Sequence, residues 1–101
     1  MMEQKTRVLV VDDSALMRQV ISRMLVEAGM EVAGTAKNGE EGLEAAKRLR
    51  PDVITLDVEM PVMDGLAMLE RLMRECPVPV VMVSSVTQQH APAAIKALAL
   101  G

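Results

Sequence analysis

Aromatic residues are missing from this chain: none of its 101 residues is phenylalanine, tyrosine or tryptophan. A buried core must therefore consist of Val, Leu, Ile and Ala together with the ten methionines, whose flexible side chains fill irregular gaps. An exposed methionine-rich groove for varied partners is the alternative. The methionines stand at helix-periodic positions, which favours packing in the core.

Cysteine is nearly absent as well. The single Cys76 cannot form an internal disulfide, which is typical of proteins of the reducing cytoplasm. No apolar run approaches the ~18 residues of a membrane span, and the polar residues 1–6 lead directly into a strand-like segment, so no signal peptide is expected. The net charge of −3 comes without a lysine or arginine stripe. We therefore expect a cytoplasmic protein without nucleic-acid or membrane partners.

Short apolar runs alternate with amphipathic segments along the chain. The runs predict strands at 7–11, 31–36, 53–56 and 80–83, and the second, which is the most polar, suits the edge of a sheet. Half of the residues are hydrophobic and the charged quarter is spread along the chain, which favours a packed core over disorder. We expect one domain that covers residues 1–101.

Helices are predicted between the strands from apolar residues at three- and four-residue spacing. The first covers 14–28 and ends at Gly29. The second begins with Asn38 and Glu41, which resemble a capping box, and ends before Pro51. The side chains expected on the buried face of the first helix are Leu16, Met17, Val20, Ile21, Met24, Leu25 and Ala28.

Two more helices are predicted in the second half of the chain. An alanine-rich last helix covers about 88–100, and the helix before it follows the turn at 60–65. The apolar residues of that third helix are Leu66, Leu69, Leu72 and Met73. Strand and helix thus alternate four times with short connections, which predicts an α/β fold with a doubly wound parallel sheet that helices cover on both faces.

Residues that can carry chemistry stand where the predicted strands end. In open parallel α/β sheets, ligands bind beyond the carboxyl ends of the strands. The first strand ends in Asp12 and Asp13, the third in Asp57 and the fourth in Ser84. If these strands are neighbours, three carboxylates and a hydroxyl meet in one crevice. A solvated loop or a helix cap is the alternative for any single aspartate, and we prefer it for Asp64, before the third helix.

Three clustered carboxylates repel one another, so either the pKa of at least one of them is raised or the cluster binds a cation. Oxygen ligands of this kind suit Mg²⁺. Beside such a cation, Asp57 can attack phosphorus as a carboxylate nucleophile and form an acyl phosphate, with Ser84 placed to donate a hydrogen bond to a phosphate oxygen. A flavodoxin-like nucleotide or flavin binder is a distant alternative. Such a binder needs a glycine- or hydroxyl-rich loop after the first strand, whose N–H groups bind phosphate. The chain has Asp12 and Asp13 there, which would repel phosphate without a cation, and it has no aromatic side chain to stack on a flavin.

Three motifs resemble a known family. Residues 8–14 read VLVVDDS, residues 52–57 read DVITLD, and residues 60–65 read MPVMDG. Over essentially the whole chain, the sequence resembles the receiver domains of bacterial response regulators. The resemblance implies a flavodoxin-like sheet in the order 2-1-3-4 and a phosphorelay in which a histidine kinase is the phosphodonor.

The same resemblance implies a role for each site residue. Asp57 is the phosphoacceptor, and Asp13 and Asp57 are ligands of Mg²⁺. Asp12 binds the waters of the metal, and the backbone carbonyl of Glu59 completes the site. Ser84 matches the hydroxyl residue that moves to the phosphate on activation.

A narrower resemblance is visible at residues 14–18 (SALMR), 57–61 (DVEMP) and 78–85 (VPVVMVSS). These segments look like the receiver of the chemotaxis protein-glutamate methylesterase, where receiver phosphorylation relieves inhibition of a C-terminal domain that hydrolyses glutamate methyl esters on chemoreceptors. By this resemblance the chain itself is a self-phosphorylating signalling switch, and the methylesterase output domain belongs to its parent protein. The alternatives are a receiver of a different response regulator and a stand-alone chemotaxis regulator.

The family pattern continues with a fifth strand that ends in Lys-Pro, and with a fifth helix. Because the sequence stops at Gly101, we expect a receiver truncated at its C-terminal end, without these elements and without the phosphate-contacting lysine. The fourth strand is then expected to be an open edge, and we expect it to allow self-association with another copy.

Overall fold

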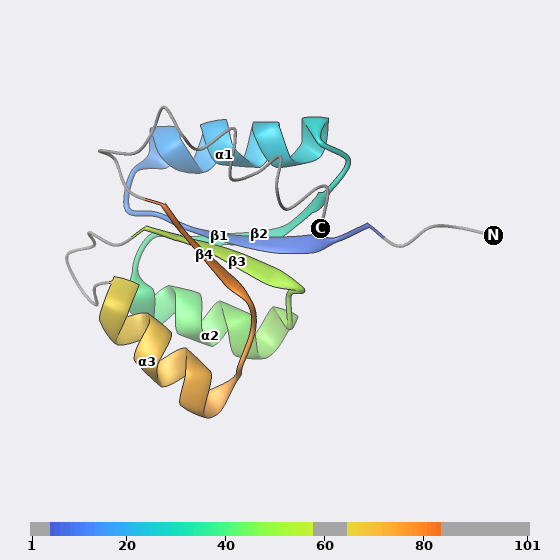
Figure 1. The fold of residues 1–101 in the computed structure, drawn as a ribbon. Helices are drawn as coiled ribbons and strands as arrows, with labels where there is room; N and C mark the ends of the chain where they lie inside the picture. Colours follow the sequence, from blue (N-terminus) through green and yellow to red (C-terminus); the bar gives the residue numbers. More distant parts are fainter. Residues whose placement is uncertain (1–4, 58–64, 84–101) are drawn as a thin grey trace.

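The computed structural model describes residues 5–57 and 65–83, in which strands and helices alternate (Figure 1). The strands are β1 (Arg7–Val11), β2 (Glu31–Ala36), β3 (Val53–Asp57) and β4 (Val80–Val83), and the helices are α1 (Ala15–Glu27), α2 (Gly39–Leu49) and α3 (Gly65–Glu75). The predicted helix at 88–100 lies outside the described residues. None of the described helices combines the length and the apolar character that crossing a membrane requires.

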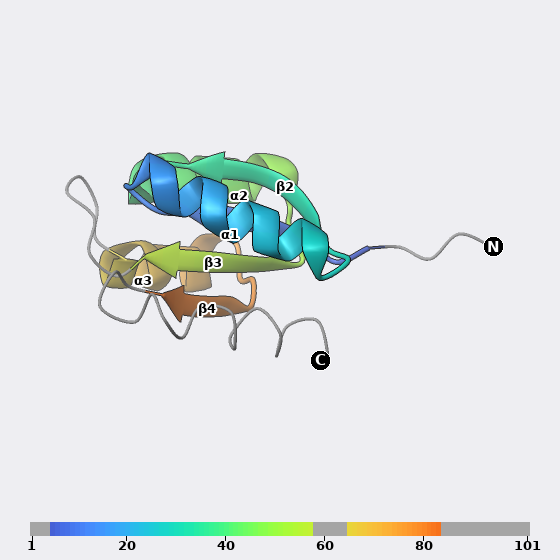
Figure 2. The ribbon, with the colours of Figure 1, turned by 90° about the horizontal axis from the view of Figure 1, so that it is seen from above.

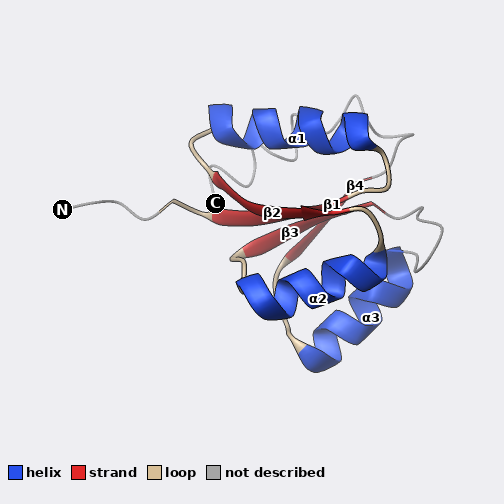
Figure 3. Ribbon diagram, turned by 180° about the vertical axis from the view of Figure 1, so that it is seen from behind, coloured by secondary structure: helices blue, strands red, loops and turns tan. Residues whose placement is uncertain are grey.

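The four strands form one parallel sheet in the order β2-β1-β3-β4, which confirms the predicted fold class. Seen from above, β2, β3 and β4 point the same way, so their carboxyl ends share one edge of the sheet (Figure 2). Helix α1 covers one face of the sheet, and α2 and α3 cover the other (Figure 3). These three layers are the arrangement expected of consecutive β-α-β units.

Each face of the sheet has its own hydrophobic core. The core on the α1 side consists of the buried residues Val8, Val10, Met17, Ile21, Leu25, Met30 and Val53. The core on the side of α2 and α3 consists of Leu9, Val11, Ala36, Leu43, Ala45, Ala46, Ile54, Leu56, Met68, Leu72 and Val78. Because β1 and β3 are covered on both faces, they are nearly continuous apolar runs, whereas β2 at the edge is more polar.

Helix α1 begins and ends one residue inside the predicted range of 14–28. Its N-cap is Ser14, whose Oγ accepts a hydrogen bond from the N–H of Met17 at 3.2 Å. Gly29 follows its C-cap with φ +88°, a left-handed conformation that glycine adopts without strain. The N–H of Gly29 and that of Met30 donate to carbonyls of the last helical turn, which stops the helix where the sequence predicts.

Helix α2 has interactions at both ends. Asn38 is its N-cap, and its Oδ1 accepts from the N–H of Glu41 at 2.8 Å. The Glu41 carboxylate accepts from the N–H of Lys37 rather than from that of Asn38, so only one half of the predicted capping box is present. At the other end, the C-cap Arg50 has the left-handed φ of +48°. The guanidinium of Arg7 donates to the carbonyl of Leu49, the last helical residue, and to that of Arg50.

The buried faces of two helices are narrower than their apolar patterns. Leu16 and Ala28 of the first predicted helix are exposed, as are Leu66 and Met73 of the third. The predicted burial of Leu16 and Ala28 is wrong because the sheet covers a narrower stripe of α1 than the apolar pattern indicates. Met68 of α3, which the apolar pattern did not single out, is fully buried.

Among the described residues, Thr55 of β3 has a buried hydroxyl without a hydrogen-bond partner, and the residue is only 1% exposed. An unsatisfied buried polar group costs about 1–3 kcal/mol. We predict that Thr55→Val raises the free energy of unfolding by about 1 kcal/mol, measured by urea denaturation. The control is Thr35→Val, an exposed position of β2. An equal gain in both variants would attribute the effect to strand propensity and contradict the prediction.

Candidate functional site

The carboxyl ends of β1 and β3 lie side by side because the two strands pair in parallel. Val11 of β1 lies beside Leu56 of β3 in the sheet register. The next residues along the chain, Asp12 and Asp57, therefore reach the same edge, where they are only 4% and 5% exposed. Asp13 follows on the loop to α1 and is exposed.

One carboxylate oxygen from each of Asp12, Asp13 and Asp57 lies within 4.8 Å of the other two. The structure thus brings together the three acidic residues singled out at the predicted strand ends. Two of them are buried and one faces solvent, so the cluster has an open side. Such a set is unfavourable without positive charge nearby, because like charges in a buried site repel.

The loop from β1 to α1 places Asp12 by several hydrogen bonds. The N–H of Asp12 donates to the carbonyl of Ala36 at 3.0 Å, which extends the pairing of β1 with β2. Its Oδ1 accepts from the N–H of Ser14 at 2.9 Å. Its carbonyl oxygen accepts from Nη1 of Arg18 at 2.7 Å. Arg18 ends the 14–18 motif of the narrower resemblance, but the sequence did not predict this contact, and only its place four residues after the helix cap could have suggested it.

The electrostatics around Asp12 favour a nearby cation. Burial raises the pKa of Asp12 above its ordinary value, and the carboxylate of Asp13 raises it further. The N–H of Ser14 and the guanidinium of Arg18 lower it, but they do not cancel the effect of burial. A cation at the cluster would favour the charged form of Asp12 and so act in the same direction as these two groups.

The donor set fits Mg²⁺. The cluster offers three carboxylates, which are hard oxygen ligands, and its exposed side leaves room for the waters that Mg²⁺ keeps. Two oxygens bound directly to one Mg²⁺ lie at most ~4.2 Å apart. The 4.8 Å limit of the cluster is therefore compatible with two direct ligands and a third carboxylate that acts through water.

The remaining predicted site residues, Glu59 and Ser84, lie outside the described residues, as does Asp64. Their placement and the roles expected for them stay predictions.

The fold has three layers, with a parallel sheet between helices, and an acidic cluster lies at the carboxyl edge of that sheet. These features define a class of α/β protein that has a candidate cation site beside a buried carboxylate. The chain belongs to the response regulator receiver domain family, whose sequence model matches residues 8–101.

Three proteins show which members of the class this chain is similar to. It is 56% identical over 101 residues to a protein-glutamate methylesterase/protein-glutamine glutaminase of Halalkalibacterium halodurans, covering 99% of this chain and 29% of the relative. It is 47% identical to the response regulator domain of Thermotoga maritima CheB, with a TM-score of 0.79, covering 94% of this chain and 72% of that one. A chain of the CheX-CheY-BeF3-Mg²⁺ complex of Borrelia burgdorferi is 32% identical, with a TM-score of 0.75, covering 89% of this chain and 71% of that one.

These similarities confirm both predicted resemblances, to response-regulator receivers and to the receiver of the chemotaxis methylesterase. The chain spans less than a third of the curated methylesterase that it matches.

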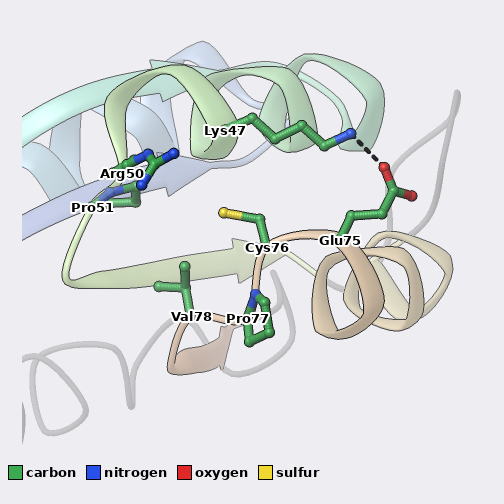
Figure 4. Close-up of a pocket in the computed structure, with 7 residues that line it drawn as sticks. All are labelled: Lys47, Arg50, Pro51, Glu75, Cys76, Pro77 and Val78. Carbon is green, nitrogen blue, oxygen red and sulfur yellow. Dashed lines mark hydrogen bonds and ion pairs between the residues drawn. The ribbon is translucent and has the colours of Figure 1, made fainter.

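A hollow of about 410 Å³ lies at the opposite end of the sheet (Figure 4). Its lining consists of Lys47, Arg50, Pro51, Glu75, Cys76, Pro77 and Val78. Lys47 of α2 forms an ion pair with Glu75 of α3, and Arg71 pairs with the same carboxylate. Because none of these residues belongs to the acidic cluster, the hollow is not part of the candidate site.

The two cations beside Glu75, first Lys47 and then Arg71, lower the pKa of Glu75 from 4.5 to about 2. Since this pKa is depressed in the folded state, the pairing stabilises the fold above about pH 4.5, and the stabilisation is lost as the pH falls towards 2.

We predict that Lys47→Met moves the NMR titration midpoint of Glu75 up towards 4.5. Lys37→Met, which removes the same charge near the start of α2, is the control and should leave the midpoint unchanged. An unshifted midpoint in Lys47→Met would show that this pair is not formed in solution.

Proposed function

We propose that this chain is a phosphorelay receiver in which Asp57 accepts a phosphoryl group from a histidine kinase with Mg²⁺. One observation carries the proposal: three carboxylates, those of Asp12, Asp13 and Asp57, lie within 4.8 Å of one another in a member of the response regulator receiver family. The cluster combines a buried nucleophile with an exposed entrance, which a phosphoryl donor needs.

In the proposed metal site, Asp13 and Asp57 are direct ligands, Asp12 binds the metal's waters, and the backbone carbonyl of Glu59 adds a further ligand. The Borrelia burgdorferi complex, one chain of which is similar to this protein, contains Mg²⁺ and BeF3 by its description, which supports this assignment. When bound, Mg²⁺ supplies positive charge that offsets the charge of the carboxylates and of the phosphoryl oxygens.

Asp57 is the proposed nucleophile. One of its carboxylate oxygens forms a bond to phosphorus, and the bond from phosphorus to the histidine nitrogen of the donor breaks. The electron pair of that bond stays on the departing nitrogen, and an acyl phosphate remains on Asp57. All five residues of β3 are buried, so the strand supports the nucleophile rigidly, which favours a reactive alignment. Ser84 is proposed to donate a hydrogen bond to a phosphate oxygen.

The parent protein is proposed to be a chemotaxis protein-glutamate methylesterase of the cytoplasm. The 56% identity to the methylesterase of Halalkalibacterium halodurans supports this assignment. Residues 1–101 are the proposed receiver, a switch rather than an enzyme, and its phosphorylation relieves inhibition of the methylesterase output domain. Strand β4 is one of the two edge strands of the described sheet, and self-association along its edge stays a prediction.

We predict that Mg²⁺ raises the melting temperature of the chain with increasing concentration, because the ion binds the folded state. At a hundredfold excess over Kd the stabilisation is ~2.7 kcal/mol. Asp13→Ala is expected to abolish the rise, since it removes a direct ligand. Glu44→Ala, at an exposed position of α2, removes the same charge away from the cluster and should keep it. Equal rises in Asp13→Ala and in the parent would contradict the proposed ligand set.

We also predict that a small phosphodonor labels the chain at Asp57 and that Asp57→Asn abolishes the labelling, because an amide cannot form the acyl phosphate. Mass spectrometry after incubation with phosphoramidate and Mg²⁺ measures the added mass. Asp52→Asn is a matched control at the other end of β3, where the side-chain oxygen that accepts from the N–H of Arg7 is retained. Persistent labelling of Asp57→Asn would place the phosphoacceptor elsewhere.

A further inference from the structure

A side chain outside the proposed ligand set holds the loop that carries two of the three acids. Arg18, in the first turns of α1, is half-buried, and its Nη1 donates to the backbone carbonyl of Asp12 at 2.7 Å. That carbonyl belongs to the planar peptide unit that joins Asp12 to Asp13. Fixing the orientation of this plane constrains the directions in which both acidic side chains leave the backbone.

The backbone of Arg18 is anchored in the same loop. Its N–H donates to the carbonyl of Ser14 at 2.9 Å, as part of the first turn of α1. Ser14 in turn donates its own N–H to Oδ1 of Asp12 at 2.9 Å. Arg18 therefore links the end of β1 to the start of α1 through its main chain and its side chain together.

We propose that Arg18 is a positioning residue for the cation site formed by Asp12, Asp13 and Asp57. The inference rests on the proposed function, and it adds to that function a residue that touches neither the metal nor the phosphate. Replacing a residue that orients metal ligands without binding the metal itself typically lowers metal affinity by ~10–100-fold.

The charge of Arg18 makes the inference easy to test, because charge and positioning predict effects of opposite sign. A guanidinium near the cluster repels a divalent cation, so charge removal alone should tighten Mg²⁺ binding. Release of the peptide plane between Asp12 and Asp13 should instead weaken it. The direction of the change therefore separates the two roles.

The experiment compares the chain with Arg18→Met, Arg18→Lys and Arg23→Met. Arg23 is exposed further along α1, so its replacement is the matched control for loss of one positive charge. For each protein, the Kd for Mg²⁺ is taken from the melting temperature as a function of MgCl2 concentration, and the melting temperature in EDTA is recorded separately. A purely structural role changes only the value in EDTA, whereas a positioning role changes the Kd.

We expect Arg18→Met to weaken Mg²⁺ binding by ~10-fold. Arg18→Lys keeps the charge, but its Nζ lies one bond nearer the backbone than the Nη1 that donates to the Asp12 carbonyl. It should therefore bind more weakly than the parent and more tightly than Arg18→Met. Arg23→Met should match the parent. Unchanged or tighter binding by Arg18→Met, while the parent binds Mg²⁺ and Asp13→Ala does not, overturns the positioning role and leaves the proposed function intact.

Absence of any Mg²⁺ response in the parent overturns the proposed function and the inference with it. If circular dichroism shows that Arg18→Met does not fold, Arg18→Lys decides. Because lysine keeps the charge, weaker binding by folded Arg18→Lys supports positioning, and parent-like binding overturns it.

Discussion

Strands β1 and β3 pair in parallel at the centre of the sheet, and the rest of the structure depends on that pairing. Their register places Val11 beside Leu56 and so brings Asp12 and Asp57 to one edge. A slip of one residue would turn the buried side chains of a strand to the wrong face. The burial of both strands on both faces therefore enforces the same register that the acidic cluster requires.

The two ends of the sheet have different electrostatic character. At the carboxyl end, three carboxylates converge and burial raises the pKa of Asp12, so this end is unfavourable for the folded state without a cation. At the amino end, Lys47 pairs with Glu75, and Arg7 pairs with Glu31. Solvent screens pairs of this kind, so they contribute little to the stability of the fold. The two hydrophobic cores must therefore offset most of the cost of the cluster.

Strands were easier to predict from the sequence than the buried faces of helices. The predicted strands differ from the observed ones only in that Asp57 belongs to β3 itself. In the helices, Leu16 and Leu66 are exposed although they fit the apolar period, while Met68 is fully buried. A period of 3.6 residues defines a broad stripe, and only the position of the helix on the sheet decides which part of the stripe is covered. The contact of Arg18 with the Asp12 carbonyl was not predicted, because no periodicity or capping pattern indicates it.

The sequence by itself determined the order of strands and helices, the parallel α/β class and the acidic residues at the strand ends. Apolar periodicity, caps and turns are local properties, so they can be read without knowing which segments meet. The tertiary structure alone decided that the carboxylates of Asp12, Asp13 and Asp57 come within 4.8 Å of one another. It also decided that burial raises the pKa of Asp12 and that Arg18 donates to the Asp12 carbonyl. These features depend on strand register and on the packing of α1, and both arise from contacts between segments distant in the chain.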